Sequence, residues 1–393
     1  MKIMAISKDN QVLKEITKKI YDMRPEMPKN KRTHYRIERA NGGLLCDLWF
    51  LTRGCTHDAS GGCTMCNYGK GTEIMDQNLM LHELQNIIKK FPWEFEDFLL
   101  TPSGSMLDER EVPRKIQKEL KVILENVKAK RFIIETRADS VNEEGLRFLN
   151  DIMPSADKYV EIGYESGNDW ILRNCINKGA EVASFERAAD LIHKAGAKVT
   201  ANIAVGIPFL SERASIYEAV TSVKKAFAQG ADSVVLFPYH VKHGTLLEVM
   251  YNDGWYQCVS LWALVAVLAQ LPVEALEQVQ ISWYKDYFGT DRSNIFVSPT
   301  TCENCKKAVV RLLDEYREDP SEVKIKKLIS YNCDCRNVWR NKMLTQKLGI
   351  EFEKIEKIYR SLAKKYGIDS EILEKELSIM KMSIRGREDG SKC

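Results

Sequence analysis

Three cysteines, Cys55, Cys63 and Cys66, stand in a C-x7-C-x2-C arrangement within a glycine-rich stretch. Thiolates are soft ligands that suit iron–sulfur clusters and zinc. Three thiolates without a fourth nearby leave one iron of a [4Fe–4S] cluster open, and an open iron can chelate a small molecule. The neighbouring glycines permit the backbone to wrap closely around a cluster. We therefore expect a [4Fe–4S] cluster with one open iron, and a structural zinc site with His57 as fourth ligand is the alternative.

Two further cysteine pairs lie in the C-terminal part of the chain. Cys302 and Cys305 form a C-x2-C pair, and Cys333 and Cys335 form a C-x-C pair. Two close pairs separated by a helical stretch are a strong signal of a metal site. Four-cysteine zinc would staple a small region that has little core of its own. A second [4Fe–4S] cluster is the other possibility, since an auxiliary cluster could take an electron, anchor a substrate or donate sulfur.

The other four cysteines stand apart from these groups. Cys46, Cys175 and Cys258 are interpreted as small buried hydrophobic residues, and Cys393 as a thiol of the tail. The N-terminal residues MKIMAISKDN contain no long apolar core, and the longest apolar stretch, 262–269, is far shorter than the roughly 20 residues that span a bilayer. We therefore expect a cytoplasmic protein with no membrane segment, whose cysteines serve metal chemistry rather than disulfides.

The composition of the chain is that of a globular protein. Hydrophobic residues make up 44% and charged residues 29% of the 393 residues, which excludes extensive disorder. The net charge of +3 is too small to establish a nucleic-acid partner. A chain of this length exceeds the size of most single cores, so a large domain and a smaller one are expected. The predicted parts are an N-terminal extension over 1–40 (a helix at 11–23 and a linker), a main domain over 41–275, a C-terminal metal- or cluster-binding region over 276–385, and a disordered tail over 386–393.

Apolar runs alternate with amphipathic segments through the predicted main domain. Short apolar strands separated by helices indicate a parallel sheet of an α/β protein, covered on its outer face. Such a series builds either an open doubly wound sheet or a barrel, and both place ligands at the carboxyl ends of the strands. The charged helices that follow about residue 275 indicate a separate, mostly helical region. The six predicted strands are 43–52, 95–102, 131–137, 158–165, 197–208 and 231–240.

Polar residues follow the second and third predicted strands. The segment TPSGSMLDE holds Ser103, Gly104 and Ser105, which offer a close backbone approach together with exposed amides or hydroxyls. Without the cysteines, the same segment would be read as an ordinary strand-to-helix connection with a capping serine. Glu135 and Arg137 end the third strand and could bind an ammonium and a carboxylate group, or could pair with each other.

The fourth and fifth predicted strands also carry polar candidates. Glu161 and Glu165 lie on one face of the fourth strand, where inward carboxylates are costly unless they are paired or liganded. Glu165 and Ser166 are candidate ligand-binding residues. Asn202 is a polar residue on the inward face of the fifth strand, and Gly206 lies in the turn at the end of that strand.

The sixth predicted strand ends in FPYHVKHGT. His240, Lys242 and His243 lie where a substrate would meet a reactive group held at the carboxyl ends of the strands. Simple solvation of these side chains is the alternative interpretation.

A cysteine loop after the first strand of such a series resembles the radical S-adenosylmethionine (SAM) superfamily. The usual spacing in that superfamily is C-x3-C-x2-C, so the first interval here is longer and the second agrees. An aromatic residue often precedes the last cysteine; Met65 stands there in this chain and Tyr68 follows. The resemblance implies a partial (β/α)6 barrel of the TIM type with SAM as a cofactor. The residues expected to bind SAM are Tyr68, Ser103, Gly104, Ser105, Glu135, Arg137, Glu165, Ser166, Asn202 and Gly206.

Several segments together are similar to one subgroup, the radical SAM component of archaeosine synthase, which is related to the Elongator catalytic subunit. They are the run 54–68, the SGS turn, the ETR strand end, EIGYESGND and PYHVKHGT. This resemblance covers roughly 40–345. It implies action on a lysine-modified 7-deazaguanine in tRNA, with cleavage of the lysine side chain to leave an amidine. The basic segment Lys29–Arg39 could contact phosphates, although such a run is more often a solvated surface.

The resemblance implies a mechanism and leaves three functions open. One-electron reduction by a donor such as flavodoxin or ferredoxin would cleave SAM, and the 5′-deoxyadenosyl radical would abstract hydrogen from a substrate. The first function is archaeosine-type modification of tRNA. The second is radical sulfur insertion or other tailoring of a small molecule, which would use an auxiliary cluster. The third is a zinc-stapled RNA-binding protein without enzymatic activity.

Overall fold

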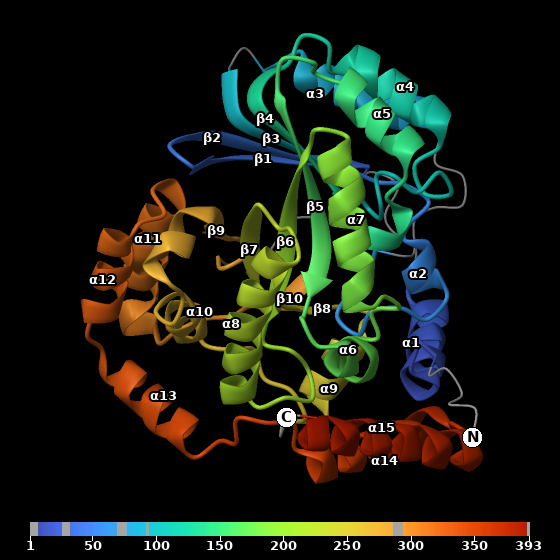
Figure 1. Cartoon of the computed structure of the whole chain (residues 1–393), viewed down its shortest axis with the longest axis vertical. Helices are drawn as coiled ribbons and strands as arrows, with labels where there is room; N and C mark the ends of the chain where they lie inside the picture. The colour runs from blue at the N-terminus through green and yellow to red at the C-terminus, as the bar shows by residue number, and fades with distance from the viewer. Residues whose placement is uncertain (1–6, 26–31, 69–76, 92–93, 286–293, 391–393) are drawn as a thin grey trace.

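The computed structural model of the chain is a curved β-sheet with helices packed on its outer face (Figure 1). Within the described part of the chain, no helix combines the length and the apolar character needed to cross a membrane. The structure describes residues 7–25, 32–68, 77–91, 94–285 and 294–390.

Six strands of the sheet are parallel and follow each other in chain order. They coincide with the six predicted strands to within three residues at each end. This arrangement confirms the predicted α/β fold, a partial barrel of the TIM type followed by a helical, cysteine-containing region. The strands are β2 (Gly43–Phe50), β3 (Glu94–Pro102), β4 (Lys128–Thr136), β5 (Asp157–Glu165), β6 (Lys198–Val205) and β7 (Ser233–Pro238).

The two faces of the sheet differ in polarity. Side chains alternate between the faces of a strand, and Phe98, Phe132 and Val160 are fully buried on one face. On the other face, Glu135 and Glu161 are neighbours in the β4–β5 register and line internal cavities. The outer face is therefore the dry core and the inner face is polar, as a binding site requires. At least one helix follows each of the strands β2 to β6 along the chain. The longest helices in these connections are α3 (Gln77–Ile88), α4 (Arg114–Ile123), α5 (Glu143–Asp151), α7 (Val182–Lys194) and α8 (Glu212–Ala228).

Two edge strands extend the sheet beyond the predicted series. β1 (Thr33–Ala40) pairs antiparallel with β2, so the expectation of a linker in this segment was wrong. β1 is rich in charge because it borders the polar interior: Arg36 lies 3.1 Å from Asp47 on β2. At the opposite edge, β9 (Val279–Ile281) pairs parallel with β7, so the sheet continues past residue 275.

The C-terminal region closes the open side of the sheet. Helix α11 (Glu303–Glu318) contacts both edge strands, β1 and β9. Helix α1 (Gln11–Met23), which the sequence predicts correctly, packs between the last two helices. Helix α15 continues to Gly390, and Cys393 lies outside the described residues. The remaining elements include the two-stranded ribbon of β8 (Val241–Lys242) and β10 (Ile295–Val297), and the helices α9 (Leu246–Asn252), α10 (Leu261–Leu268), α12 (Glu322–Ser330), α13 (Asp334–Leu344), α14 (Phe352–Tyr366) and α15 (Ser370–Gly390).

Candidate active site and metal centre

The first cysteine group lies in the loop that directly follows β2. The Cys55 amide donates to the Tyr68 carbonyl at 3.2 Å and closes the loop, and the Cys66 amide donates to the Cys63 carbonyl at 3.3 Å. Cys55 and Cys63 each lie close enough to Cys66 for electrostatic repulsion between the thiolates. Burial raises the pKa of the Cys63 thiol to about 11 and that of Cys66 to about 12. The three partly buried thiols thus lie in one loop, where their thiolates could hold an iron–sulfur cluster.

The position of His57 does not support the zinc alternative for this loop. Its Nε2 lies 2.9 Å from the carbonyl oxygen of Asn177, while the Asn177 amide donates to the Gly61 and Gly62 carbonyls at 2.9 Å each. Gly61 has φ +91°, and a Cβ there would lie 2.2 Å from the Lys14 carbonyl. The histidine supports the loop from outside.

Arg137 lies beside the cluster loop, but it does not pair with Glu135. Its Nη1 is 3.4 Å from the Cys55 Sγ and 2.6 Å from Glu111, and its Nη2 is 2.6 Å from Asp108. Glu111 was absent from the predicted site, although its side chain is fully buried and its carboxylate also accepts from the Thr56 amide at 2.8 Å. An acidic residue in a loop carries no local signal that it will contact a segment 55 residues away. Arg137 and Glu111 therefore form a buried ion pair that holds the loop.

The SGS turn is closed by hydrogen bonds within the protein, and its residues do not line the outer cavity described below. The Ser103 Oγ accepts from the Thr52 amide at 2.7 Å, and the Ser105 hydroxyl lies 2.5 Å from that of Thr136. Both serine side chains are fully buried. A Cβ on Gly104 would lie 2.3 Å from the Glu111 Oε2, so this position requires glycine. The prediction of exposed serine hydroxyls was wrong because both close the turn from within.

Glu165 faces the interior at the end of β5. The backbone has φ 63° there and the register with β6 shifts between Gly163 and Glu165. Its carboxylate lies 3.0 Å from the Lys178 Nζ and accepts from the Tyr239 hydroxyl at 2.7 Å. Ser166 turns the other way, and its hydroxyl donates to Glu218 on α8 at 2.6 Å. The structure therefore brings Glu165 to the interior and takes Ser166 away from it.

A cavity of about 170 Å³, which we call the outer cavity, opens at the carboxyl ends of the strands. It unites six predicted site residues with the cluster loop. The Oδ1 of Asn202 is buried at its wall and has no hydrogen-bond partner among the described residues. Gly206 does not line this cavity. Its backbone N–H is not available to a ligand, because it donates to the Ser215 hydroxyl at 2.7 Å. The lining residues are Met65, Cys66, Tyr68, Glu135, Glu165, Asn202, Phe237, Pro238, Tyr239, His240, Lys242 and Trp283.

The three candidates after the last predicted strand have different surroundings. His240 is buried, its Nε2 lies 2.5 Å from the Trp283 carbonyl and its Nδ1 lies 3.0 Å from the Ser298 hydroxyl. The Lys242 Nζ lies in the outer cavity, 4.9 Å from the centre of the Tyr68 ring. His243 is not brought to this cavity: its side chain is half exposed and its Nδ1 lies 2.8 Å from Glu248.

Trp283 is a site residue that sequence reasoning missed. Its backbone has φ 58°, which is unusual for a bulky side chain. The side chain lines both the outer cavity and a deeper one of about 80 Å³ that also contains Glu135 and Glu161. The Lys242 Nζ lies 5.6 Å from the centre of its ring. Trp283 thus separates the two interior cavities.

The second cysteine group forms a compact site. The four Sγ atoms all lie within 4.8 Å of one another. The distances are 3.5 Å from Cys302 to Cys305, 3.6 Å from Cys302 to Cys333, and 3.5 Å from Cys305 to Cys335. The Trp262 indole N–H points at the Cys335 Sγ at 3.4 Å. Cys46 and Cys175 are buried as predicted, whereas Cys258 is only partly buried.

A parallel half-barrel with three thiols at the carboxyl end of its first parallel strand defines a class of protein. The Radical SAM superfamily model matches residues 49–219, and the chain belongs to this superfamily. Archaeosine synthase subunit beta of Thermococcus kodakarensis is 31% identical over 223 residues, which are 55% of this chain and 68% of that protein. The protein of the same name from Methanosarcina acetivorans is 29% identical over 299 residues, covering 74% and 82%.

A search of solved structures finds an Elp3 protein of Methanocaldococcus infernus with an N-terminal deletion. Its TM-score is 0.45 at 20% identity, with 61% of this chain and 59% of that chain covered.

Proposed function

We propose that this chain is the radical SAM component of an archaeosine-type enzyme, acting on a modified 7-deazaguanine nucleoside in tRNA. The observation that carries the proposal is the outer cavity, where Cys66 of the cluster loop adjoins Glu165 and Asn202. The similarity to two proteins named archaeosine synthase subunit beta supports the substrate class. SAM and a one-electron reductant such as flavodoxin or ferredoxin are the expected partners.

The protein's own groups serve binding and positioning. When bound, a [4Fe–4S] cluster supplies the electron that cleaves SAM to a 5′-deoxyadenosyl radical. Cys55, Cys63 and Cys66 would hold this cluster. The Arg137 guanidinium, 3.4 Å from the Cys55 Sγ, stabilises that sulfur as a thiolate. The absence of a side chain at Gly104 makes room for the Glu111 carboxylate, which holds the SGS turn beside the cluster loop.

The walls of the outer cavity suit SAM and a planar base together. The Asn202 Oδ1, buried without a partner in the described structure, would accept a hydrogen bond from a bound ligand. Glu165 would contact the polar groups of SAM, with Lys178 and Tyr239 holding its carboxylate in place. Trp283 lines the same cavity, and its ring, which has Lys242 Nζ 5.6 Å from its centre, would stack on a base.

We further propose that the C-terminal group, Cys302, Cys305, Cys333 and Cys335, holds zinc. A tetrahedral zinc with Zn–S bonds of about 2.3 Å places its sulfurs about 3.8 Å apart. The Sγ–Sγ distances of 3.5 and 3.6 Å agree with one such ion. A four-iron cluster would stand between its thiolates and spread them further. This geometry favours a structural role over the auxiliary cluster of the sulfur-insertion alternative.

Metal analysis of anaerobically purified protein tests both assignments. We expect about four irons and about one zinc per chain, and 5′-deoxyadenosine when dithionite and SAM are added. Cys63→Ala should abolish the iron and the 5′-deoxyadenosine and leave the zinc, whereas the matched variant Cys46→Ala should change neither. About eight irons would support the sulfur-insertion alternative. Zinc without iron would support the non-enzymatic RNA-binding alternative.

A further inference from the structure

Residues 322–348, which we call the basic face, carry a local excess of positive charge. This segment holds seven Lys and Arg residues and two acidic residues, a net charge of +5. The whole chain carries +3, so the remaining residues carry −2. The basic face comprises α12, α13 and the residues that join and follow them. The near balance of the whole chain therefore hides a local excess of cations.

The N-terminal basic run differs in its described part, residues 32–39, while Lys29 and Lys31 lie outside the described residues. Among its described residues, Arg32 lies 2.9 Å from Glu83, and Arg39 lies 3.2 Å from Glu318. Arg36 is bound within the sheet by Asp47, as described above. Arg32 and Arg36 therefore have little charge to offer a phosphate, whereas the Arg39 side chain remains 69% exposed.

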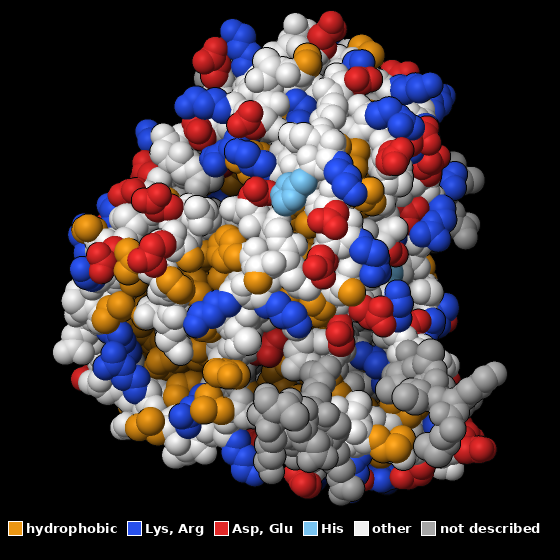
Figure 2. Space-filling model, in the orientation of Figure 1, with side chains coloured by type: hydrophobic (Ala, Val, Ile, Leu, Met, Phe, Trp, Pro, Cys, Tyr) orange, Lys and Arg blue, Asp and Glu red, His pale blue; other side chains and the backbone are white. Residues whose placement is uncertain are grey.

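Three of the seven cations of the basic face remain available to a ligand, because Arg336 is buried and the other three are paired with carboxylates (Lys326, Lys327 and Lys342). Lys324 and Arg340 have no carboxylate partner within the described chain. Lys347 reaches Glu351 only at 4.0 Å, with its side chain 76% exposed, and such surface pairs contribute little. Figure 2 shows Lys and Arg side chains grouped at the left edge of the molecule, near the positions of α12 and α13 in Figure 1, beside an apolar area.

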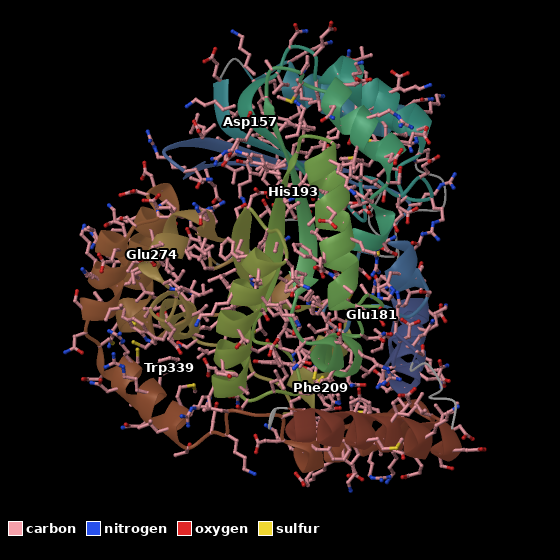
Figure 3. The ribbon with its side chains drawn as sticks, viewed as in Figure 1. Asp157, Glu181, His193, Phe209, Glu274 and Trp339 are labelled. Carbon is pink, nitrogen blue, oxygen red and sulfur yellow. The ribbon has the colours of Figure 1, made fainter. Side chains whose placement is uncertain are left out.

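The four-cysteine site holds this face in a fixed relation to the outer cavity. Cys333 stands directly before α13, and the site joins it to the start of α11. The indole N–H of Trp339 on α13, labelled in Figure 3, donates to Glu212 at 2.9 Å. Glu212 is the first residue of α8, the helix that follows β6, whose inward residue Asn202 lines the outer cavity. The Ser211 hydroxyl also donates to the Lys347 carbonyl at 2.9 Å.

We propose that the basic face, held by the four-cysteine metal site, binds the phosphates of the RNA whose target nucleotide enters the outer cavity. This inference rests on the proposed function and gives the metal site a role in substrate docking rather than in electron transfer. RNA is the favoured partner because Lys324, Arg340 and Lys347 of this face are not balanced by close carboxylates of the described chain. The exposed Val338 and Leu344 would instead suit a protein partner.

The test compares two triple variants in a fluorescence-anisotropy titration of labelled full-length tRNA over a range of salt concentrations. K324A/R340A/K347A removes three cations of the basic face. K115A/K118A/K121A removes three from α4, at the opposite end of the molecule in Figure 1, and is the matched control. We expect the first variant to bind roughly tenfold or more weakly, with its log–log salt slope lower by about 0.9 per lost contact. The control should bind like the parent protein.

A metal variant provides the second arm. Cys333→Ser should lose the zinc and weaken tRNA binding, and should still form 5′-deoxyadenosine from SAM in the absence of tRNA. Equal tRNA affinity of the basic-face variant and its control would overturn the docking proposal and would leave Val338 and Leu344 as evidence for a protein partner. A parent protein that cleaves SAM but binds no tRNA would overturn the substrate of the proposed function as well.

Discussion

The carboxylate of Glu111 is the polar centre on which the cluster loop, the SGS turn and Arg137 converge. Its Oε1 accepts from the Thr56 amide and hydroxyl at 2.8 and 2.7 Å, and its Oε2 accepts from the Ser105 amide at 2.6 Å. Arg137 lies 2.6 Å away, and the Glu111 side chain has no exposed surface. Replacement by alanine would therefore leave the Thr56 and Ser105 amides without their acceptor, and the Arg137 guanidinium would lose one of its carboxylate partners.

The magnitude follows from these contacts. Breaking a buried ion pair by removing one partner costs about 3–5 kcal/mol. Four hydrogen bonds to a charged group would add up to more, at about 1.5–3 kcal/mol each. Arg137 retains Asp108 at 2.6 Å, which limits the loss. We therefore expect Glu111→Ala to lower the free energy of unfolding by about 3–5 kcal/mol. Glu111→Gln keeps one acceptor oxygen and should cost about 1–3 kcal/mol.

The assay is urea unfolding of the metal-free protein, together with the iron content after reconstitution. Glu109→Ala is the control, because that side chain is 53% exposed and pairs only at the surface with Arg114. It should change the unfolding free energy by about 0–1 kcal/mol. We also expect Glu111→Ala to take up less iron than Glu109→Ala, because the Cys55 end of the loop loses its anchor. If Glu111→Ala and Glu109→Ala unfold at the same urea concentration, the reasoning is refuted.

Two further predictions concern the walls of the outer cavity. Trp283→Ala should lower turnover of the nucleoside roughly tenfold, since base–aromatic stacking contributes about 1–3 kcal/mol. Formation of 5′-deoxyadenosine should persist in this variant, so that SAM cleavage is no longer coupled to nucleoside turnover. Trp283→Phe should restore that coupling. A high-performance liquid chromatography assay of both products measures this, and unchanged coupling in the alanine variant would contradict it. Tyr239→Phe removes the 2.7 Å hydrogen bond to Glu165 and should weaken SAM binding about fivefold, as loss of roughly 1 kcal/mol implies. Calorimetric titration with SAM tests it, and an unaltered affinity would show that Glu165 needs no such support.

The fold was largely predictable because its signals are local. Each parallel strand is a short apolar run buried on at least one face, and each is followed by a helical period. The sequence did not predict the strand β1, and the reason is physical. Its inward residues, such as Arg36, are charged because they face the polar interior, where Asp47 balances them. A strand of that kind has the composition of an exposed linker, and only its partner strand reveals it.

The candidate site divides in the same way. Ser166 and His243 stand at positions that alternation alone would place near a ligand, yet a register shift and a two-stranded ribbon turn them elsewhere. Glu111 and Trp283 belong to the site because they contact segments far away in sequence. The residue spacing within their own segments does not predict these contacts. Side-chain direction after a bulge or a left-handed residue depends on packing.

The cysteines illustrate both sides of this division. The sequence by itself determined that the chain has two groups of cysteines, one of three and one of four, and that a strand precedes the first. Ligand type and spacing are properties of short segments and can be read from them directly. Only the tertiary structure decided how the groups are used. It set His57 outside the first group, and it drew Cys302 and Cys333, far apart along the chain, to a sulfur spacing of 3.6 Å. That distance depends on how helices α11 and α13 pack, and it is what favours a single zinc ion.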